Sequence, residues 1–137
     1  MEISEIASEF VVDELKEEIK KIENDYDYII MDTAAGTHCD VISAVGGVDI
    51  VFAVTEPTPL GEHDVSLILN LLKKLNLDSK LIINRSDIAD SSGVKSIAGE
   101  YGVEVAAEIG YSKKVLEQYS RGVPVEHEAI EKLAGSL

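Results

Sequence analysis

The 137-residue sequence predicts an α/β fold, in which helices on both faces cover a mostly parallel sheet of about four strands. Two observations favour this three-layer arrangement. Short, continuous apolar runs alternate along the chain with stretches whose apolar residues recur at helical spacing. Polar residues and glycines follow the apolar runs. Since no repeat or linker interrupts this pattern, we expect residues 1–137 to form a single domain.

The composition favours an ordinary globular domain. Hydrophobic residues make up 45% and charged residues 28% of the chain, as is typical of such domains. No run approaches the ~18 consecutive apolar residues of a membrane helix. The acidic N-terminal stretch also lacks the basic-then-apolar pattern of a signal peptide. We therefore expect no membrane span and a cytoplasmic location.

The charge and cysteine content exclude several classes of partner and cofactor. With 12 basic and 26 acidic residues, the chain has a formal net charge of −14, which repels nucleic acid. Cys39 is the single cysteine. We therefore expect no nucleic-acid partner, no internal disulfide and no iron–sulfur cluster built from this chain alone.

The helical stretches come next. Residues 3–23 carry apolar side chains at steps of three and four, which places them on one helical face. The same spacing predicts helices over residues 65–75, 94–101 and 126–134. Ser112 is a typical N-cap residue for a further short helix. The helices over residues 65–75 and 94–101 lie between apolar runs, as crossover connections of a parallel sheet require.

The apolar runs predict the strands, at residues 28–31, 48–54, 81–83 and 103–109. Asp49 interrupts the second run, and the fourth run is weaker, but none alternates strictly with polar residues. Runs of this kind suit strands buried on both faces of a parallel sheet. In such sheets ligands bind beyond the carboxyl ends of the strands. The residues that follow each run are therefore the first candidates for a functional site.

Asp32 follows the first run, and Gly36 follows Asp32 in an Asp-x-x-x-Gly pattern. An aspartate displayed at a sheet edge is suited to holding Mg²⁺ through water. A glycine allows its backbone N–H to approach a terminal phosphate closely. The same residues are also typical of a plain turn or a helix N-cap. The spacing alone leaves both interpretations open.

Asn84 to Asp87 follow the third run as Asn-Arg-Ser-Asp. The Asn84 side chain offers both donors and an acceptor, so it is suited to reading the edge of a purine. Asn and Asp are also favoured in turns that bind nothing. The third run alone therefore does not decide between a base-binding site and a turn.

Several segments together resemble a known family. YDYIIMDTAAG, VDIVFAVTEPTP, LGEHD and LIINRSD resemble, in order and spacing, the MinD/Mrp branch of SIMIBI-class P-loop ATPases. The resemblance covers roughly residues 25–125. It is strongest to the MinD-superfamily ATPases with an inserted ferredoxin domain, which share the VTEPTP segment and a loop like that of residues 36–39.

The resemblance implies roles for the residues at the phosphate end of a site. Asp32 resembles the Walker B or switch aspartate, which acts near Mg²⁺ and holds it through water. Gly36 resembles the switch glycine that senses the γ-phosphate. The implied cofactors are ATP or ADP with Mg²⁺, and the implied fold is part of a P-loop NTPase domain.

The resemblance also implies a base-binding end. Asn84 resembles the asparagine that contacts adenine, and Arg85 would flank the base. Gly110 and Tyr111 would lie near the ribose or the base. Asp87 makes the segment similar to the guanine-reading motif of GTPases as well. The broader resemblance favours adenine, and the choice between the two bases stays open.

The phosphate-binding loop of the family is missing from these 137 residues. No G-x-x-x-x-G-K-[ST] pattern occurs, and the cysteines of the ferredoxin insert are absent too. That loop cradles the phosphates, and phosphoryl transfer depends on such positioning. We therefore expect that this chain alone does not hydrolyse ATP, and the sequence leaves open whether it is an enzyme.

The missing loop also bears on folding and partners. In the family, the strand before that loop lies between the switch-aspartate strand and the next one. Either the chain needs a complementing P-loop segment, or its sheet closes without that strand. An exposed strand edge promotes self-association, and the family implies ATP-driven dimerisation. The expected partner is therefore a second copy or a complementing P-loop segment, with the client protein unknown.

Two rival functions remain, together with one weak metal pattern. The family has roles in positioning, partition and iron–sulfur or metallocentre handling. The chain would otherwise be a truncated, non-enzymatic partner-binding module, or a generic doubly wound regulatory domain.

His38, Cys39 and Asp40 are potential metal ligands, but consecutive residues rarely all point at one ion. Cys39 is better interpreted as a small, buried apolar residue at the start of a helix.

Overall fold

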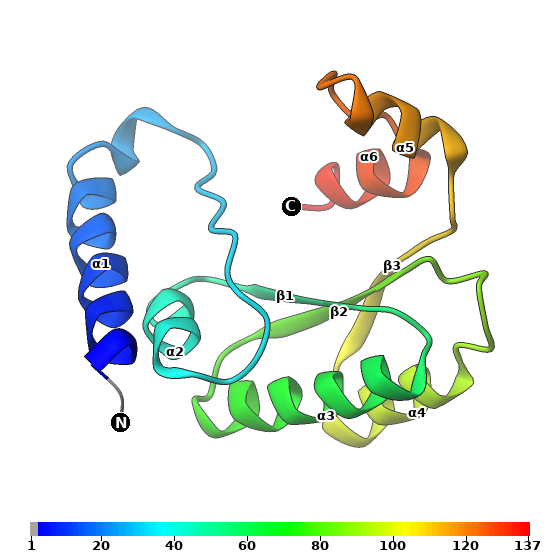
Figure 1. Ribbon diagram of the computed structural model, residues 1–137, viewed down its shortest axis with the longest axis horizontal. Helices are drawn as coiled ribbons and strands as arrows, with labels where there is room; N and C mark the ends of the chain where they lie inside the picture. Colours follow the sequence, from blue (N-terminus) through cyan, green and yellow to red (C-terminus); the bar gives the residue numbers. More distant parts are fainter. Residues whose placement is uncertain (1–2) are drawn as a thin grey trace. The chain divides into compact units, whose positions relative to one another are not determined.

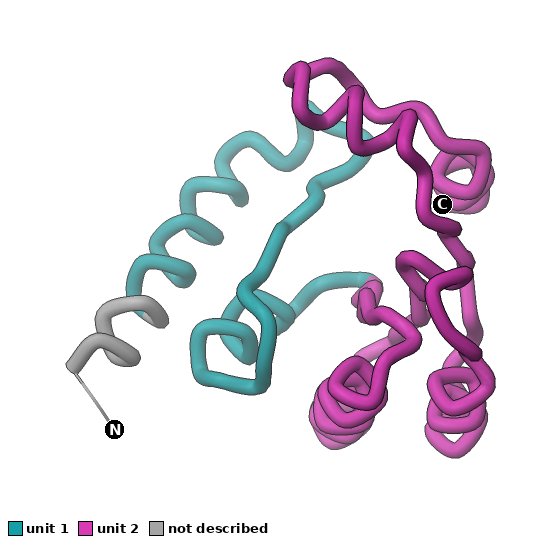
Figure 2. The backbone as a smooth tube through the Cα atoms, turned by 45° about the vertical axis from the view of Figure 1, so that its right-hand side comes forward, with its two compact units in different colours: residues 1–49 teal, residues 50–137 magenta. Residues whose placement is uncertain are grey.

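A computed structural model describes the backbone of residues 3–137 and the side chains from residue 10 onward. The chain divides into two compact units, residues 1–49 and residues 50–137. Figure 1 shows the helices and strands, and Figure 2 colours the two units teal and magenta. Each unit is described separately below.

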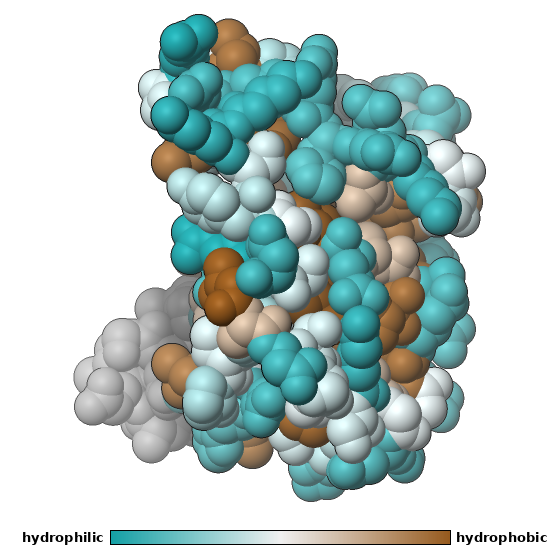
Figure 3. Space-filling model, turned by 90° about the vertical axis from the view of Figure 1, so that its right-hand side faces the viewer, coloured by the Kyte–Doolittle hydropathy of each residue, from teal (hydrophilic) through white to brown (hydrophobic). Residues whose placement is uncertain are grey.

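The surface in Figure 3 is largely hydrophilic. Hydrophilic residues cover much of the face in Figure 3, and apolar residues lie between them in smaller groups. Among the described residues, no helix combines the length and the apolar character that a membrane crossing requires.

The first unit consists of two α-helices and one short 3-10 helix. They are α1 (Ile3–Lys20), η1 (Glu23–Asp25) and α2 (Cys39–Val45). Helix α1 packs against α2. Val41, Ala44 and Val45 of α2 are buried. The first expected helix is thus confirmed over residues 3–20, and its last expected residue, Glu23, begins η1.

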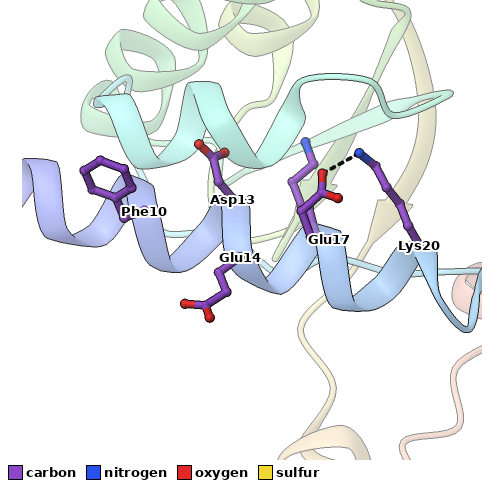
Figure 4. A pocket seen from close by; sticks show the side chains of 6 residues that line it. Phe10, Asp13, Glu14, Glu17 and Lys20 are labelled. Carbon is purple, nitrogen blue, oxygen red and sulfur yellow. Dashed lines mark hydrogen bonds and ion pairs between the residues drawn. The ribbon is translucent and has the colours of Figure 1, made fainter.

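Polar contacts join α1 to α2. The Lys16 ammonium donates hydrogen bonds to the carbonyl oxygens of Ser43, at 2.8 Å, and Gly46. A cation at this end of α2 satisfies carbonyls that the helix leaves free, and it complements the negative end of the helix dipole. The Ser43 hydroxyl donates to Asp13, which points toward α2, while Glu14 points away from it (Figure 4).

The strand expected over residues 28–31 is not formed, so that prediction was wrong. These residues lie in neither a helix nor a strand. Tyr28, Ile29 and Ile30 are 63%, 43% and 89% exposed. A parallel strand needs a neighbour for its N–H and C=O groups, and within the described residues this run has none.

The second unit contains the sheet. Strands β1 (Val51–Thr55), β2 (Ser79–Asn84) and β3 (Glu104–Ile109) pair in parallel in the order β1-β2-β3. Three of the expected strands are thus confirmed, with small shifts in their ends. The sheet has three strands in the described residues, where about four were expected.

Helices cover both faces of this sheet, as expected. Helices α3 (Pro59–Lys74) and α4 (Ser92–Tyr101) lie on one face and contact β1 and β3 respectively. After α5 (Lys113–Ser120), helix α6 (Glu128–Ala134) contacts β3 from the other side (Figure 1). The α/β class is therefore confirmed.

The core of this unit lies between the sheet and the pair α3 and α4. Its fully buried side chains come from α3, β2 and α4: Val65, Leu69, Leu72, Leu81, Ile83 and Val94. Residues on α3 recur at the spacing of one helical face, so they reach the sheet together. The continuous run of β2 is buried at three consecutive positions, as a strand covered on both faces requires.

Local signals set the helix ends near the site. The Thr58 hydroxyl accepts a hydrogen bond from Gly61 N–H at 3.0 Å and caps α3. The Ser112 hydroxyl accepts from Val115 N–H at 3.3 Å, which confirms the expected cap of α5. A Cβ added to Gly61 would lie 2.2 Å from the Glu56 carbonyl oxygen. Glycine at this position therefore lets α3 start directly beside the end of β1.

Candidate functional site

The carboxyl ends of the three parallel strands meet at one edge of the sheet. Asn84 is the last residue of β2 and pairs in register with Ile109, the last residue of β3. Glu56 follows the end of β1. The loops after these strands therefore start side by side, where ligands bind in sheets of this type.

Arg85 links the ends of β1 and β2. Its guanidinium lies 3.5 Å from a Glu56 carboxylate oxygen. Its backbone has a φ of 47°, a left-handed conformation that costs a non-glycine residue about 1–2 kcal/mol. An exposed ion pair is worth up to about 1 kcal/mol. The ion pair therefore contributes no more than the strain costs. Strained backbone of this kind clusters at functional sites.

Asp87 links the ends of β2 and β3. Its Oδ1 accepts a hydrogen bond from the backbone N–H of Tyr111 at 2.6 Å. The backbone N–H of Ser86 donates to the Ile109 carbonyl at 3.0 Å. These contacts extend the β2–β3 connection beyond the last strand residues, so the two loops are held as one surface.

Gly110 and Tyr111 belong to that surface. The Tyr111 side chain is 53% exposed, so part of its ring is open to a ligand. A Cβ on Gly110 would lie 3.5 Å from Asp87 Oδ2, an ordinary contact distance. The position therefore has room for a larger residue. The structure brings together all the residues expected at the base-binding end, which are Asn84, Arg85, Asp87, Gly110 and Tyr111.

Two residues at the end of β1 follow an apolar run in the sequence, but the sequence-based prediction gave neither an individual role. Glu56 pairs with Arg85, and the buried Thr55 donates from its hydroxyl to the Gly61 carbonyl at 2.9 Å. Both contacts hold the loop between β1 and α3 in place. The sequence places Glu56 after an apolar run, but its pairing with Arg85 depends on β1 lying beside β2, which only the strand order reveals.

Asp32 and Gly36 belong to the first unit, whereas the base-end residues belong to the second. Both residues are exposed and lie between η1 and α2, in a segment without helix or strand. Gly36 has a φ of 110°, where an L side chain would be strained. This backbone conformation is by itself a reason for glycine at position 36, independent of any contact with a phosphate.

The described residues contain no cluster of three or more potential metal-ligating side chains. His38 precedes α2 as its N-cap residue, and Cys39 starts that helix. Asp40 accepts a hydrogen bond from Val41 N–H at 2.9 Å. Cys39 is exposed, so the expectation that it is buried was wrong. The short helix turns its first residue toward solvent.

The chemistry of the strand ends suits a nucleoside base better than a triphosphate. The Asn84 amide offers donors and an acceptor, and the partly exposed Tyr111 ring offers a face for stacking. Arg85 is already paired with Glu56, and Asp87 adds a second carboxylate to the loops at these strand ends. With Glu56 and Asp87 against Arg85, the loops after β1 and β2 offer no surplus of positive charge for phosphates.

Known proteins include relatives whose sequences are similar to this chain. No family model matches the sequence. An uncharacterised protein of Methanocaldococcus jannaschii is 39% identical over 93 residues, which is 68% of this chain and 31% of that protein. The septum site-determining protein MinD of Bacillus subtilis is 22% identical over 120 residues, 82% of this chain and 45% of MinD. The chain thus spans less than half the length of these relatives.

Solved structures show the same fold. The cell division ATPase MinD of Pyrococcus furiosus is 25% identical, with a TM-score of 0.74 over 90% of this chain and 56% of that one. MinD of Pyrococcus horikoshii, solved with Mg-ADP, is 26% identical, with a TM-score of 0.73 over 91% of this chain and 56% of that one. The chain therefore has the fold of part of a MinD-type P-loop ATPase.

Proposed function

We propose that this chain is the base-binding part of a MinD-like ATPase and that it takes ATP or ADP with Mg²⁺. The observation that carries the proposal is the hydrogen bond of 2.6 Å between Tyr111 N–H and Asp87. It holds Tyr111 beside the end of β2, where Asn84 offers its amide. Similarity to a MinD solved with Mg-ADP supports the identity of the ligand.

In this proposal Asn84 reads the edge of the purine through its amide. Arg85 flanks the base, and the Tyr111 ring stacks on it. A guanine-reading carboxylate has to accept from the base, and one oxygen of Asp87 accepts from Tyr111 N–H. The carboxylate keeps further acceptor sites, so the preference for adenine rests on the family resemblance.

Asp32 and Gly36 serve the phosphate end in the same proposal. Asp32 would hold Mg²⁺ through water, and the bound ion would neutralise charge on the phosphates. Gly36 would offer its backbone N–H to the γ-phosphate. These roles come from the family resemblance of the segment around Asp32.

We further propose that the chain alone is not hydrolytic, because its 137 residues contain no glycine-rich phosphate loop. Turnover would require a complementing P-loop segment, and the complete site would work as a homodimer or with a partner protein. A link to iron–sulfur or metallocentre handling is the finer form of this proposal. The missing loop favours one rival, a non-enzymatic module that binds only a partner.

Titration of fluorescent ATP and ADP analogues with Mg²⁺ tests the proposal. We expect binding that Asn84→Ala and Asp32→Ala both weaken. Asn24→Ala, at an exposed position in η1, is the matched control and should leave binding unchanged. Absence of binding up to millimolar nucleotide would favour the partner-binding module. Steady ATP turnover that Asp32→Ala abolishes would contradict the non-hydrolytic part of the proposal.

A further inference from the structure

We propose that Glu56 is a positioning residue of the base-binding end, because its carboxylate holds the Arg85 guanidinium in place before a nucleotide arrives. The base-binding role of Arg85 rests on the proposed function. The hold of Glu56 on Arg85 rests on contacts that all lie within residues 50–137.

The backbone of Glu56 is fixed on both sides. The buried Thr55 comes directly before it and donates its hydroxyl to the Gly61 carbonyl at 2.9 Å. The Thr58 N–H donates to the Glu56 carbonyl oxygen at 2.8 Å, and Gly61 lets α3 begin against that same oxygen. The Glu56 side chain therefore leaves a loop that is tied to both β1 and α3, which suits it to support a neighbouring side chain.

Arg85 is fixed along its backbone but has a long, flexible side chain. The Ile88 N–H donates to the Arg85 carbonyl oxygen at 3.1 Å, and the Ser86 N–H donates to Ile109 on β3 at 3.0 Å. These bonds hold the loop and leave the rotamers of the Arg85 side chain free. The Glu56 carboxylate, 3.5 Å from the guanidinium, restrains the far end of that side chain.

Positioning accounts for the ion pair better than stability or charge does. Both side chains of the pair are more than a third exposed to solvent, and ion pairs of this kind contribute little to stability. The Glu56 carboxylate also cancels the positive charge with which Arg85 would attract phosphates, in a chain of formal net charge −14. The orientation of the guanidinium remains. A side chain that is ordered before its ligand binds lowers the entropy cost of binding.

The hold on Arg85 is measured without any nucleotide. NMR relaxation of the Arg85 Nε–H group reports the motion of the side chain on the ps–ns timescale. We expect Glu56→Ala to increase this motion. Glu104→Ala is the matched control, since it breaks the ion pair of 3.3 Å with Lys80 at the start of β3 and should leave Arg85 unchanged. Equal motion of the Nε–H group in Glu56→Ala and the parent chain would overturn the proposal.

The effect on base binding is measured with adenosine. This probe carries no charge, so removing a carboxylate does not change a long-range repulsion of phosphates. We expect Glu56→Ala to weaken adenosine binding about three- to tenfold in a chemical-shift titration, the range for losing the order of one long side chain. Glu104→Ala should bind like the parent chain. Unchanged adenosine binding by Glu56→Ala would overturn the proposal.

A double-mutant cycle shows whether Glu56 acts through Arg85. In the Arg85→Gln background, Glu56→Ala should weaken adenosine binding no further. A second loss of the same size in that background would overturn the proposal. Glu56→Gln keeps the size of the side chain and one acceptor oxygen, so its adenosine affinity should lie between those of Glu56→Ala and the parent chain. Urea denaturation should give nearly the same free energy of unfolding for all three, as a loss of folding would not.

The two measurements separate this inference from the proposed function. If Glu56→Ala frees Arg85 and the parent chain binds neither adenosine nor the ATP analogues, the hold is confirmed. The proposed function then fails, and the base-binding role of the pair fails with it. If the parent chain binds adenosine and Glu56→Ala neither frees Arg85 nor weakens that binding, the proposed function stands and the inference fails.

Discussion

Tyr111 donates its backbone N–H to the Asp87 carboxylate across 2.6 Å, although the two residues lie 24 positions apart in the chain. The contact ties the loop after β3 to the loop after β2. Hydrogen bonds to a charged acceptor are stronger than those between neutral groups. Asp87 is therefore a positioning residue for Tyr111.

Replacing Asp87 tests this positioning role. We expect Asp87→Ala to speed hydrogen exchange at the Tyr111 amide by about tenfold, because a lost hydrogen bond of this kind costs about 1–2 kcal/mol. Asp87→Asn keeps an oxygen acceptor and should preserve most of the protection. The Asp87→Ala variant should also bind the nucleotide analogues more weakly. Unchanged exchange at Tyr111 in Asp87→Ala would contradict the role.

Arg85 gives a prediction in which stability and binding change in opposite directions. Arg85→Gly removes the strain of a φ of 47°, and we expect a gain of about 1 kcal/mol in the free energy of unfolding. The same change removes the guanidinium that pairs with Glu56 and should weaken analogue binding. Urea denaturation and analogue titration measure the two effects.

Asn76 is the control for Arg85, with a φ of 54° at the end of α3. Asparagine tolerates this conformation better than arginine, so Asn76→Gly should add less stability and leave analogue binding unchanged. If Arg85→Gly binds the analogues as well as the parent chain, the guanidinium has no part in the site.

Gly61 and Gly99 form a matched pair of glycines within helices. A Cβ at Gly61 would lie 2.2 Å from the Glu56 carbonyl oxygen, whereas a Cβ at Gly99 would meet nothing within 4 Å. We expect Gly61→Ala to lower the free energy of unfolding by about 2 kcal/mol, as overpacking does. Gly99→Ala should raise it by about 0.5–1 kcal/mol. Equal effects in thermal or urea unfolding would show that α3 shifts to accommodate the methyl group.

The lowered pKa of the Asp90 carboxyl group predicts that stability depends on pH. Hydrogen bonds from the Ser92 hydroxyl and backbone N–H, with a smaller effect of the Lys95 charge, hold the pKa of Asp90 below its ordinary value of 3.8. Because the folded state lowers this pKa, the carboxylate stabilises the fold above the unfolded pKa. The contribution is lost as the pH falls through the folded pKa.

The measurement compares the parent chain with Asp90→Ala in urea denaturation across the acidic range. The difference in the free energy of unfolding should be largest near neutral pH and shrink below about pH 4. A difference that stays constant down to pH 2 would show that the contribution of Asp90 does not depend on its charge.

The local elements followed from the sequence because each depends on residues close together in the chain. The helical spacing of α3 and α4, the cap at Ser112 and the apolar runs of β2 and β3 are of this kind. The residues that follow each strand could also be identified, since a run of apolar residues ends where the strand ends. The sequence therefore predicts the base-end candidates but not the contacts between them.

The tertiary structure decided everything that depends on which strands are neighbours. The apolar run at residues 28–31 has strand-like composition, yet it forms no strand, because pairing needs a second backbone beside it. Arg85 meets Glu56, and Asp87 receives Tyr111 N–H, because β2 lies between β1 and β3. These partners are far apart in sequence, so periodicity and composition alone do not identify them.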